Sequence, residues 1–166
     1  AFFYGGLVRR KNVCNTIMAC VAIMGLSVVM WTLFGYSLSF GGNHAGIIGD
    51  FRWFGLNGVG MEAGPYADSI PHLVFCAFQM MFAMITPALT GSLVGRMKFK
   101  ALFLFVAIWS VIVYYPMAHM VWGDGGFLAA IGSVDFAGGD VVHISSGISA
   151  LVLAIILGRR RGYEHT

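Results

Sequence analysis

Four long stretches of the chain contain no Asp, Glu, Lys or Arg and consist mostly of apolar side chains: residues 13–40, 70–95, 101–121 and 141–158. About 20 helical residues cross a hydrocarbon core that is about 30 Å thick. Each stretch is therefore long enough to span a membrane as a helix. We predict transmembrane helices over residues 13–40, 70–95, 101–122 and 139–158. Residues 1–8 are apolar but too short to cross, and we expect them to be the end of a helix whose beginning is missing.

The composition supports this interpretation, since 58% of the 166 residues are hydrophobic and 10% are charged. Soluble domains contain about 25% charged residues. We therefore predict an all-α, polytopic helical protein of the cell membrane, with about four complete transmembrane helices and the lipid bilayer as its surroundings. The pattern argues against a nucleic-acid partner. No nucleophile, base and orienting acid occur in a recognisable order, so we do not expect an enzyme. The three cysteines have no CxxC spacing, and we expect no metal, disulfide or cofactor.

Charge predicts the orientation of the helices. Nine of the ten Lys and Arg residues form three clusters, at 9–11, 96–100 and 159–161, which the four crossings place on one side. The loops on the other side, residues 41–69 and 123–138, contain acidic residues and only one arginine, Arg52. The positive-inside rule then makes the basic loops cytoplasmic and these two loops external. In the first external loop we expect irregular backbone, with a short interfacial helix at residues 52–56.

The stretch 70–95 places three aromatic side chains, Phe75, Phe78 and Phe82, on one helix face. Such a stripe is typical of a surface that faces lipid or packs in a core. The alternative is that it has a functional role. Gln79 lies beside it, and its amide needs a partner in an apolar surrounding, which favours the protein interior. Pro87 removes a backbone donor, so we expect a bend near residues 84–86.

Trp122 stands at the outer end of the third stretch, where an aromatic residue anchors a helix at the headgroup level. The alternative is that its face holds a cation near Asp124. His119 lies about one turn deeper and suits a hydrogen-bonded packing position.

The last stretch begins with Asp135 and Asp140, either of which suits the N-terminus of the helix, where negative charge is favoured. His143 aligns with Gly147, Ala150 and Ala154 in a stripe of small residues that permits close helix contact. We therefore expect His143 on the buried face, as a neutral residue that donates from one ring nitrogen and accepts at the other. An intramembrane ionisable residue is a functional candidate, although a structural histidine is the alternative.

Four segments together resemble the ammonium transporter family, in the right order and over essentially the whole chain: FFYGGLVRRKNV, IPHLVFCAFQMMFAMITPAL, AHMVWGDGG and DFAGGDVVHISSGISALVLAIILGRR. The resemblance implies a homotrimer whose subunits have about eleven transmembrane helices in two inverted halves, with the transport path between the halves. This chain then corresponds to the end of helix 1 through helix 5 and is a fragment containing the first half. Trp122 favours the ammonium transporters proper over their Rhesus relatives.

The same resemblance implies roles for single residues. Phe78 and Phe82 match the aromatic pore gate, and Trp122 and Asp135 match the outer ammonium-recruiting region. His143 matches the first of two facing pore histidines, and Gln79 falls beside the gate.

This sequence departs from the family pattern at two positions. Asp140 stands where relatives have a small polar residue, and it adds a charge one turn before His143, in the pore or a proton path. Gly95 replaces a glutamate before Arg96. These departures bear on ion attraction and on the inner helix connection.

The resemblance implies that ammonium is recruited outside and deprotonated before passage through a hydrophobic pore, with methylammonium as an analogue. A cytoplasmic regulatory protein is a further expected partner. The alternative is an ammonium sensor or receptor coupled to a signalling module, with little or no transport. A membrane scaffold without a pore is the third possibility.

Overall fold

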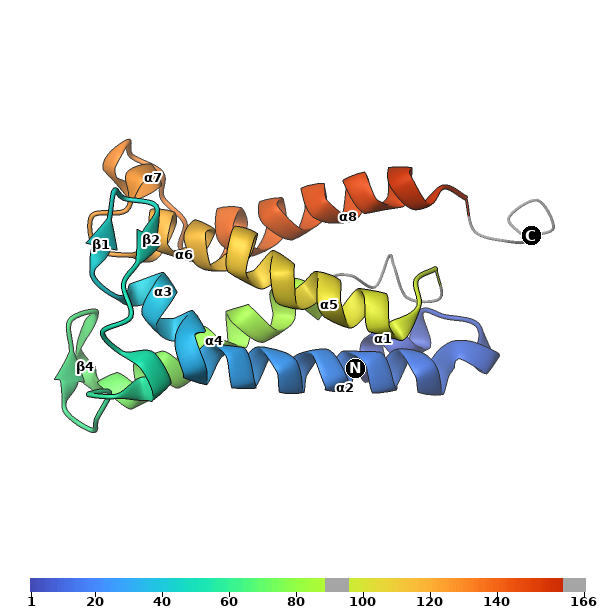
Figure 1. Ribbon diagram of the computed structural model, residues 1–166, viewed down its shortest axis with the longest axis horizontal. Helices are drawn as coiled ribbons and strands as arrows, with labels where there is room; N and C mark the ends of the chain where they lie inside the picture. Colours follow the sequence, from blue (N-terminus) through green and yellow to red (C-terminus); the bar gives the residue numbers. More distant parts are fainter. Residues whose placement is uncertain (89–95, 160–166) are drawn as a thin grey trace.

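A computed structural model describes residues 1–88 and 96–159. The chain is mostly helical, and its long helices lie side by side along one direction (Figure 1). The two loops predicted to be external, residues 41–69 and 123–138, gather at one end of the bundle with their short strands, and they are called the external loops after that prediction. The beginnings of α2 (Val13–Met30) and α5 (Phe99–Trp109) and the end of α8 (Ser145–Leu157) lie at the other end.

The first crossing is an unbroken helical run that follows a short helix, α1 (Phe2–Gly6), and a 3₁₀ turn, Arg10–Asn12. It consists of α2 (Val13–Met30), a π-helical turn (Trp31–Gly35) and α3 (Tyr36–Phe40). The chain leaves the helix at Gly41, where the backbone becomes extended.

The first external loop contains two small antiparallel sheets, which the all-α prediction did not anticipate. Strands β1 (Asn43–His44) and β2 (Ile48–Gly49) form one sheet, and β3 (Ala63–Gly64) and β4 (Ala67–Pro71) form the other. Because Pro71 pairs with Ala63, the helix expected from residue 70 begins at His72 instead. A 3₁₀ turn, Phe54–Leu56, falls within the region where a short interfacial helix was expected.

Three further helical segments complete the bundle. Helix α4 (His72–Ala88) runs back from the external end, and its backbone is helical through residues 84–86 and Pro87, so the bend expected there stays a prediction. The rest of the expected helix, including Gly95, lies outside the described residues. The next segment joins α5 (Phe99–Trp109), a π-helical turn (Ser110–Tyr114) and α6 (Tyr115–Trp122). Pro116 explains the irregular turn, because it has no N–H to donate to the preceding turn of helix.

The second external loop includes the single-turn helix α7 (Phe127–Ala130). A π-helical turn (Gly139–Ile144) then leads into α8 (Ser145–Leu157). Among the described residues, three helical stretches are apolar and long enough to cross a membrane: Arg10–Phe40, Phe99–Ala130 and Gly139–Leu157. The apolar part of α4, His72–Ile85, is shorter.

Aromatic side chains form the core between the first and third crossings. Trp31, Tyr36 and Tyr115 are at most 1% exposed, and the Trp31 ring lies 5.7 Å from that of Tyr36 and 6.1 Å from that of Tyr115. The Trp31 indole N–H donates to the Cys76 carbonyl at 3.2 Å, which ties α4 to this core. A Cβ at Gly35 would lie 2.6 Å from the Tyr115 ring, so glycine permits this close approach.

Charged residues separate between the two ends of the bundle. The described basic clusters around Arg10, Lys98 and Arg159 adjoin the beginnings of α2 and α5 and the end of α8, at one end (Figure 1). Six acidic residues lie in or beside the loops at the other end: Asp50, Glu62, Asp68, Asp124, Asp135 and Asp140. The fold therefore places the clusters as the charge pattern predicted. Which end faces the cytoplasm stays a prediction.

Candidate functional site

Phe78, Phe82 and Trp122, predicted from separate parts of the sequence, form one aromatic row. The rings of Phe78 and Phe82 lie 5.4 Å apart in an edge-on arrangement, one turn apart on α4. The Phe82 ring also lies 5.4 Å from the ring of Trp122, at the end of α6. Phe78 is 47% exposed, whereas Phe82 and Trp122 are half-buried. The row thus runs from an open face of α4 to the external loops.

Asp135 joins this row through its backbone, because its carbonyl accepts a hydrogen bond from the Trp122 indole N–H at 2.8 Å. The bond fixes the plane of the indole ring. It also connects the end of α6 to the segment that precedes α8.

The Asp135 carboxylate caps the helix that contains His143. One oxygen accepts from the backbone N–H groups of Gly138 and Gly139 at 2.6 and 2.8 Å, and the other accepts from those of Asp140 and Val141 at 2.8 and 3.0 Å. Partial burial opposes ionisation, but these four donors together hold the pKa of Asp135 below its ordinary value. Of the two aspartates considered as the cap, Asp135 is the one whose carboxylate serves this purpose.

His143 is bonded to the same turn. Its Nδ1 lies 2.8 Å from the Gly138 carbonyl oxygen, and because a carbonyl only accepts, Nδ1 donates. In the neutral ring, Nε2 is then an acceptor. Gly138 has a φ of +90°, and a Cβ there would lie 2.7 Å from the Val142 side chain and 3.8 Å from Phe82. Glycine at this position therefore brings the histidine turn close to the aromatic row.

Within the described residues His143 does not lie on the buried side of its helix, where it was expected. His143 and Gly147 are exposed, and the buried side of the helix instead contains Val142, Ser145 and Ser146. The serine hydroxyls donate to carbonyls one turn earlier, at 2.5 Å from Ser145 to Val141 and from Ser146 to Val142. Serines satisfied in this way permit close packing as well as glycine or alanine does, and they form the contact face.

Asp140 has a partner that the sequence did not suggest. Its Oδ2 accepts from the Ser133 hydroxyl at 2.7 Å, across the loop that precedes the helix. The side chain is half-buried, one turn before His143. The contact explains how the additional charge is accommodated.

Gln79 lies on a different face of α4 from the aromatic row. It is 8% exposed and shares its buried face with Cys76 and Ala83. Its Oε1 has no hydrogen-bond partner among the described residues. The expected interior position is observed, but it does not bring Gln79 into the row.

His119 is a buried packing residue. It is 0% exposed, its Nδ1 lies 3.0 Å from the Ser39 carbonyl oxygen, and its Nε2 lies 3.3 Å from the Asn43 amide oxygen. These contacts connect α6 to α3, at Ser39, and to the first external loop, at Asn43. Across residues 1–88 and 96–159, no group of three or more His, Cys, Asp or Glu side chains is arranged to hold a metal ion.

Two residues of the site were missed by the sequence prediction. Ser133 has no distinctive sequence signal, since a loop serine is common. Gly138 had one: a Gly-Gly pair directly before a helix often provides a positive φ. The described contacts bring Phe78, Phe82, Trp122, Asp135 and His143 together.

Comparison with known proteins relates this chain to a family. The model of the Ammonium Transporter Family matches residues 1–166. The chain is 49% identical, over 162 residues, to the ammonium transporter of Bacillus subtilis (strain 168). The matched segment covers 97% of this chain and 40% of the relative.

Solved structures give the same result for the fold. The crystal structure of Candida albicans Mep2 has a TM-score of 0.76 and 34% identity, covering 89% of this chain and 32% of that one. A structure described as a sensor Amt protein has a TM-score of 0.82 and 28% identity, and the match covers 95% of this chain and 39% of that one. The chain thus spans about 40% of the length of the curated relatives it matches.

Proposed function

Because the chain belongs to the ammonium transporter family, we propose that the complete protein moves ammonium, as ammonia, across the membrane through a pore within each subunit. The observation that supports this most directly is the contact row from Phe78 through Phe82 and Trp122 to the turn of Asp135 and His143. The row runs from the external loops to an open face of α4, and Gly138 of the turn that contains His143 lies close to Phe82.

Ammonium is collected at the external end. The acidic residues of the two loops attract cations, and the Trp122 face stabilises one by cation-π attraction, which is worth about 1–2 kcal/mol when partly desolvated. Asp135 keeps its charge because four backbone donors stabilise the carboxylate. It supports the recruiting region electrostatically and orients Trp122.

The charge is lost before the aromatic gate. A bare cation costs several kcal/mol at the centre of a bilayer, on the order of 3 by insertion scales and more by others. Passage past Phe78 and Phe82 therefore favours the neutral molecule. Beyond them, Nε2 of His143 accepts a hydrogen bond from ammonia, since Nδ1 already donates to Gly138.

The open face around His143 and Phe78 belongs to the pore, and we propose that the remaining part of the protein covers it. The complete protein is a homotrimer in the cell membrane. Its basic clusters face the cytoplasm, where a regulatory protein can bind, and residues 41–69 and 123–138 face outside.

Sensing is the second candidate function, and the similarity to a structure described as a sensor Amt protein favours keeping it. In a sensor, the same row binds ammonium and transmits occupancy to a signalling module, with little or no flux.

Methylammonium uptake tests the proposal. Cells without their own ammonium transporters would express the full-length protein, its His143→Ala variant, or an empty vector. We expect uptake above the vector for the full-length protein and a large loss for the variant. Uptake equal to the vector, with the protein present in the membrane, would reject transport and leave sensing to be tested by ammonium binding. Unchanged uptake by His143→Ala would reject the role of that residue.

A further inference from the structure

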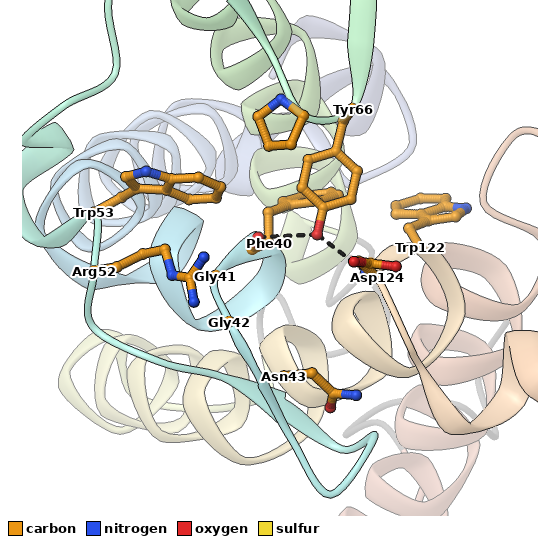
Figure 2. A pocket seen from close by; sticks show the side chains of 10 residues that line it. Phe40, Gly41, Gly42, Asn43, Arg52, Trp53, Tyr66, Trp122 and Asp124 are labelled. Atoms are coloured by element: carbon orange, nitrogen blue, oxygen red, sulfur yellow. Dashed lines mark hydrogen bonds between the residues drawn. The ribbon is translucent and has the colours of Figure 1, made fainter.

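A pocket of about 470 Å³ lies between the two external loops, on the external side of the aromatic row. Figure 2 shows its lining, to which the end of α3, the first external loop and the end of α6 contribute: Phe40, Gly41, Gly42, Asn43, Arg52, Trp53, Pro65, Tyr66, Trp122 and Asp124. Trp122 borders this pocket and also contacts Phe82. The pocket is large enough for an organic molecule well above the size of ammonium.

Arg52 provides a fixed cation at one side. Its Nε lies 3.1 and 3.0 Å from the two carboxylate oxygens of Asp50, which holds the guanidinium in place. Its two Nη atoms form no hydrogen bond with the described residues. Gly42 is what allows this position, because a Cβ there would lie 2.0 Å from Nη2 of Arg52.

Asp124 provides an anion at the other side. Its backbone N–H donates to the Tyr66 hydroxyl at 3.0 Å, and that hydroxyl donates to the Phe40 carbonyl at 2.9 Å, so the loop is anchored. The Asp124 carboxylate has no ion pair within residues 1–88 and 96–159. In Figure 2 it lies across the pocket from the Arg52 guanidinium, and the two do not pair.

The walls between these charges are aromatic. Trp53 stacks on Tyr36 with its ring centroid 5.4 Å away, which fixes the indole, and the Arg52 guanidinium carbon lies 5.9 Å from the Trp53 ring. Tyr66 stacks on Phe75 with an interplanar angle of 6°. Both rings are therefore held by neighbours behind them and form rigid surfaces for apolar groups.

We propose that this pocket binds a zwitterionic α-amino acid with an apolar side chain. The ligand carboxylate lies against the two Nη atoms of Arg52, whose planar fork suits it. The ligand ammonium group lies against Asp124 and the Trp122 face, and the apolar side chain contacts Trp53 and Tyr66. A simple cation uses only the Asp124 side and meets the Arg52 charge on the other, so both charges in one pocket favour a ligand with both signs.

Three ligands of matched shape test the proposal on the purified full-length protein: L-leucine, isoamylamine, which lacks the carboxylate, and 4-methylpentanoate, which lacks the ammonium group. Calorimetry measures their affinities. We expect L-leucine to bind about tenfold or more tightly than either analogue, because each analogue loses one charge-assisted partner. Equal affinities for L-leucine and isoamylamine would overturn the proposal in favour of a plain cation site. No saturable binding of L-leucine would reject it.

Variants assign the two ends. Arg52→Gln should weaken L-leucine binding about tenfold and leave isoamylamine binding unchanged or stronger, since the positive charge that opposes a simple cation is removed, whereas Asp124→Asn should weaken both. Gly42→Ala displaces the guanidinium without removing its charge and should also weaken L-leucine. Asp68→Asn, on an exposed residue of the same loop that does not line the pocket, is the matched control. Unchanged L-leucine affinity in Arg52→Gln would contradict the model of binding.

Methylammonium uptake, measured on the same protein, separates this inference from the proposed function. Loss of L-leucine binding with normal uptake rejects the pocket alone. Normal L-leucine binding without uptake rejects transport alone.

Discussion

The first and last crossings of this chain are both apolar helices, but residues 31–40 of the first are packed much more closely than α8. In the first crossing, Trp31 and Tyr36 are 1% and 0% exposed, enclosed by Phe40 and Tyr115. In α8, Ile148 and Ile155 are 59% and 71% exposed. Apolar composition alone therefore does not distinguish a helix that completes a core from one that presents its surface to lipid or to the rest of the protein.

The difference separates stability from chemistry. The buried part of the first crossing has its aromatic contacts and the close approach at Gly35, and it makes them within the described residues. The exposed helix has His143, with one bond to its own turn and an open Nε2 side. We therefore expect substitutions in the first region to change the free energy of unfolding, and substitutions near His143 to change transport.

The largest effect is expected from Trp31→Ala. The change leaves a cavity among rings that are themselves buried and removes the bond to the Cys76 carbonyl, so it should lower the free energy of unfolding by about 3–5 kcal/mol. Denaturation of the purified full-length protein in mixed micelles, followed by circular dichroism, measures it. A loss below about 1 kcal/mol would mean that this core is less closely packed than its contacts indicate.

Asp135→Asn should have the next largest effect. The amide keeps one accepting oxygen but turns its NH₂ group toward N–H donors, at a cost of about 1.5–3 kcal/mol. The folded pKa lies below the unfolded value of about 3.9, so the carboxylate contributes fully above that pH. The contribution is lost as pH falls through the folded pKa. Unfolding measured from neutral to acidic pH should show this loss in the native protein and not in the variant. Parallel pH profiles would contradict it.

Gly35→Ala tests the close packing of the first crossing against Tyr115 by adding a single methyl group. The added methyl would meet the Tyr115 ring at 2.6 Å, and that ring is 1% exposed and cannot move away. We expect destabilisation by about 1–3 kcal/mol. Gly25→Ala in the same helical run is the matched control, since no atom of the described residues lies within 4 Å of its added Cβ. It should be neutral or stabilise by up to about 1 kcal/mol. Similar losses in both variants would show that helix geometry, not the ring contact, decides the effect.

The charge-free runs of the sequence located the helices because burying charge in hydrocarbon is costly wherever the helix lies. They did not locate β4, since Ile70 and Pro71 are apolar in a strand as in a helix, and only pairing with Ala63 distinguishes the two. They also did not identify which side of α8 packs. A stripe of glycine and alanine and a stripe of serine both consist of small residues. Contact with the neighbouring helix decides which of the two stripes is packed.

The site was predictable where a residue type has one strong requirement. Asp135 before a helix predicts a cap, and a buried amide at Gln79 predicts an interior position. The partnership of Asp140 with Ser133 depends on the path of a loop, and no local pattern in the sequence encodes it. The same holds for the pocket between Arg52 and Asp124, whose loops meet only in the folded chain.

The smallest change in stability is expected from His143→Ala, and it gives the sharpest contrast between the two regions. In the proposed pore His143 does not fill a packed core, and its described hydrogen bond is the one to the Gly138 carbonyl, so the variant should unfold within about 0.5–1.5 kcal/mol of the native protein. His119→Ala is the matched histidine in the buried region: it empties a fully buried position and leaves the Ser39 carbonyl without its donor, so its loss should be clearly larger. Micelle unfolding and methylammonium uptake, measured on both variants, separate the two residues. If His143→Ala destabilises the protein as much as His119→Ala does, the histidine belongs to a core completed by the rest of the protein, and its loss of uptake would no longer indicate a role in the pore.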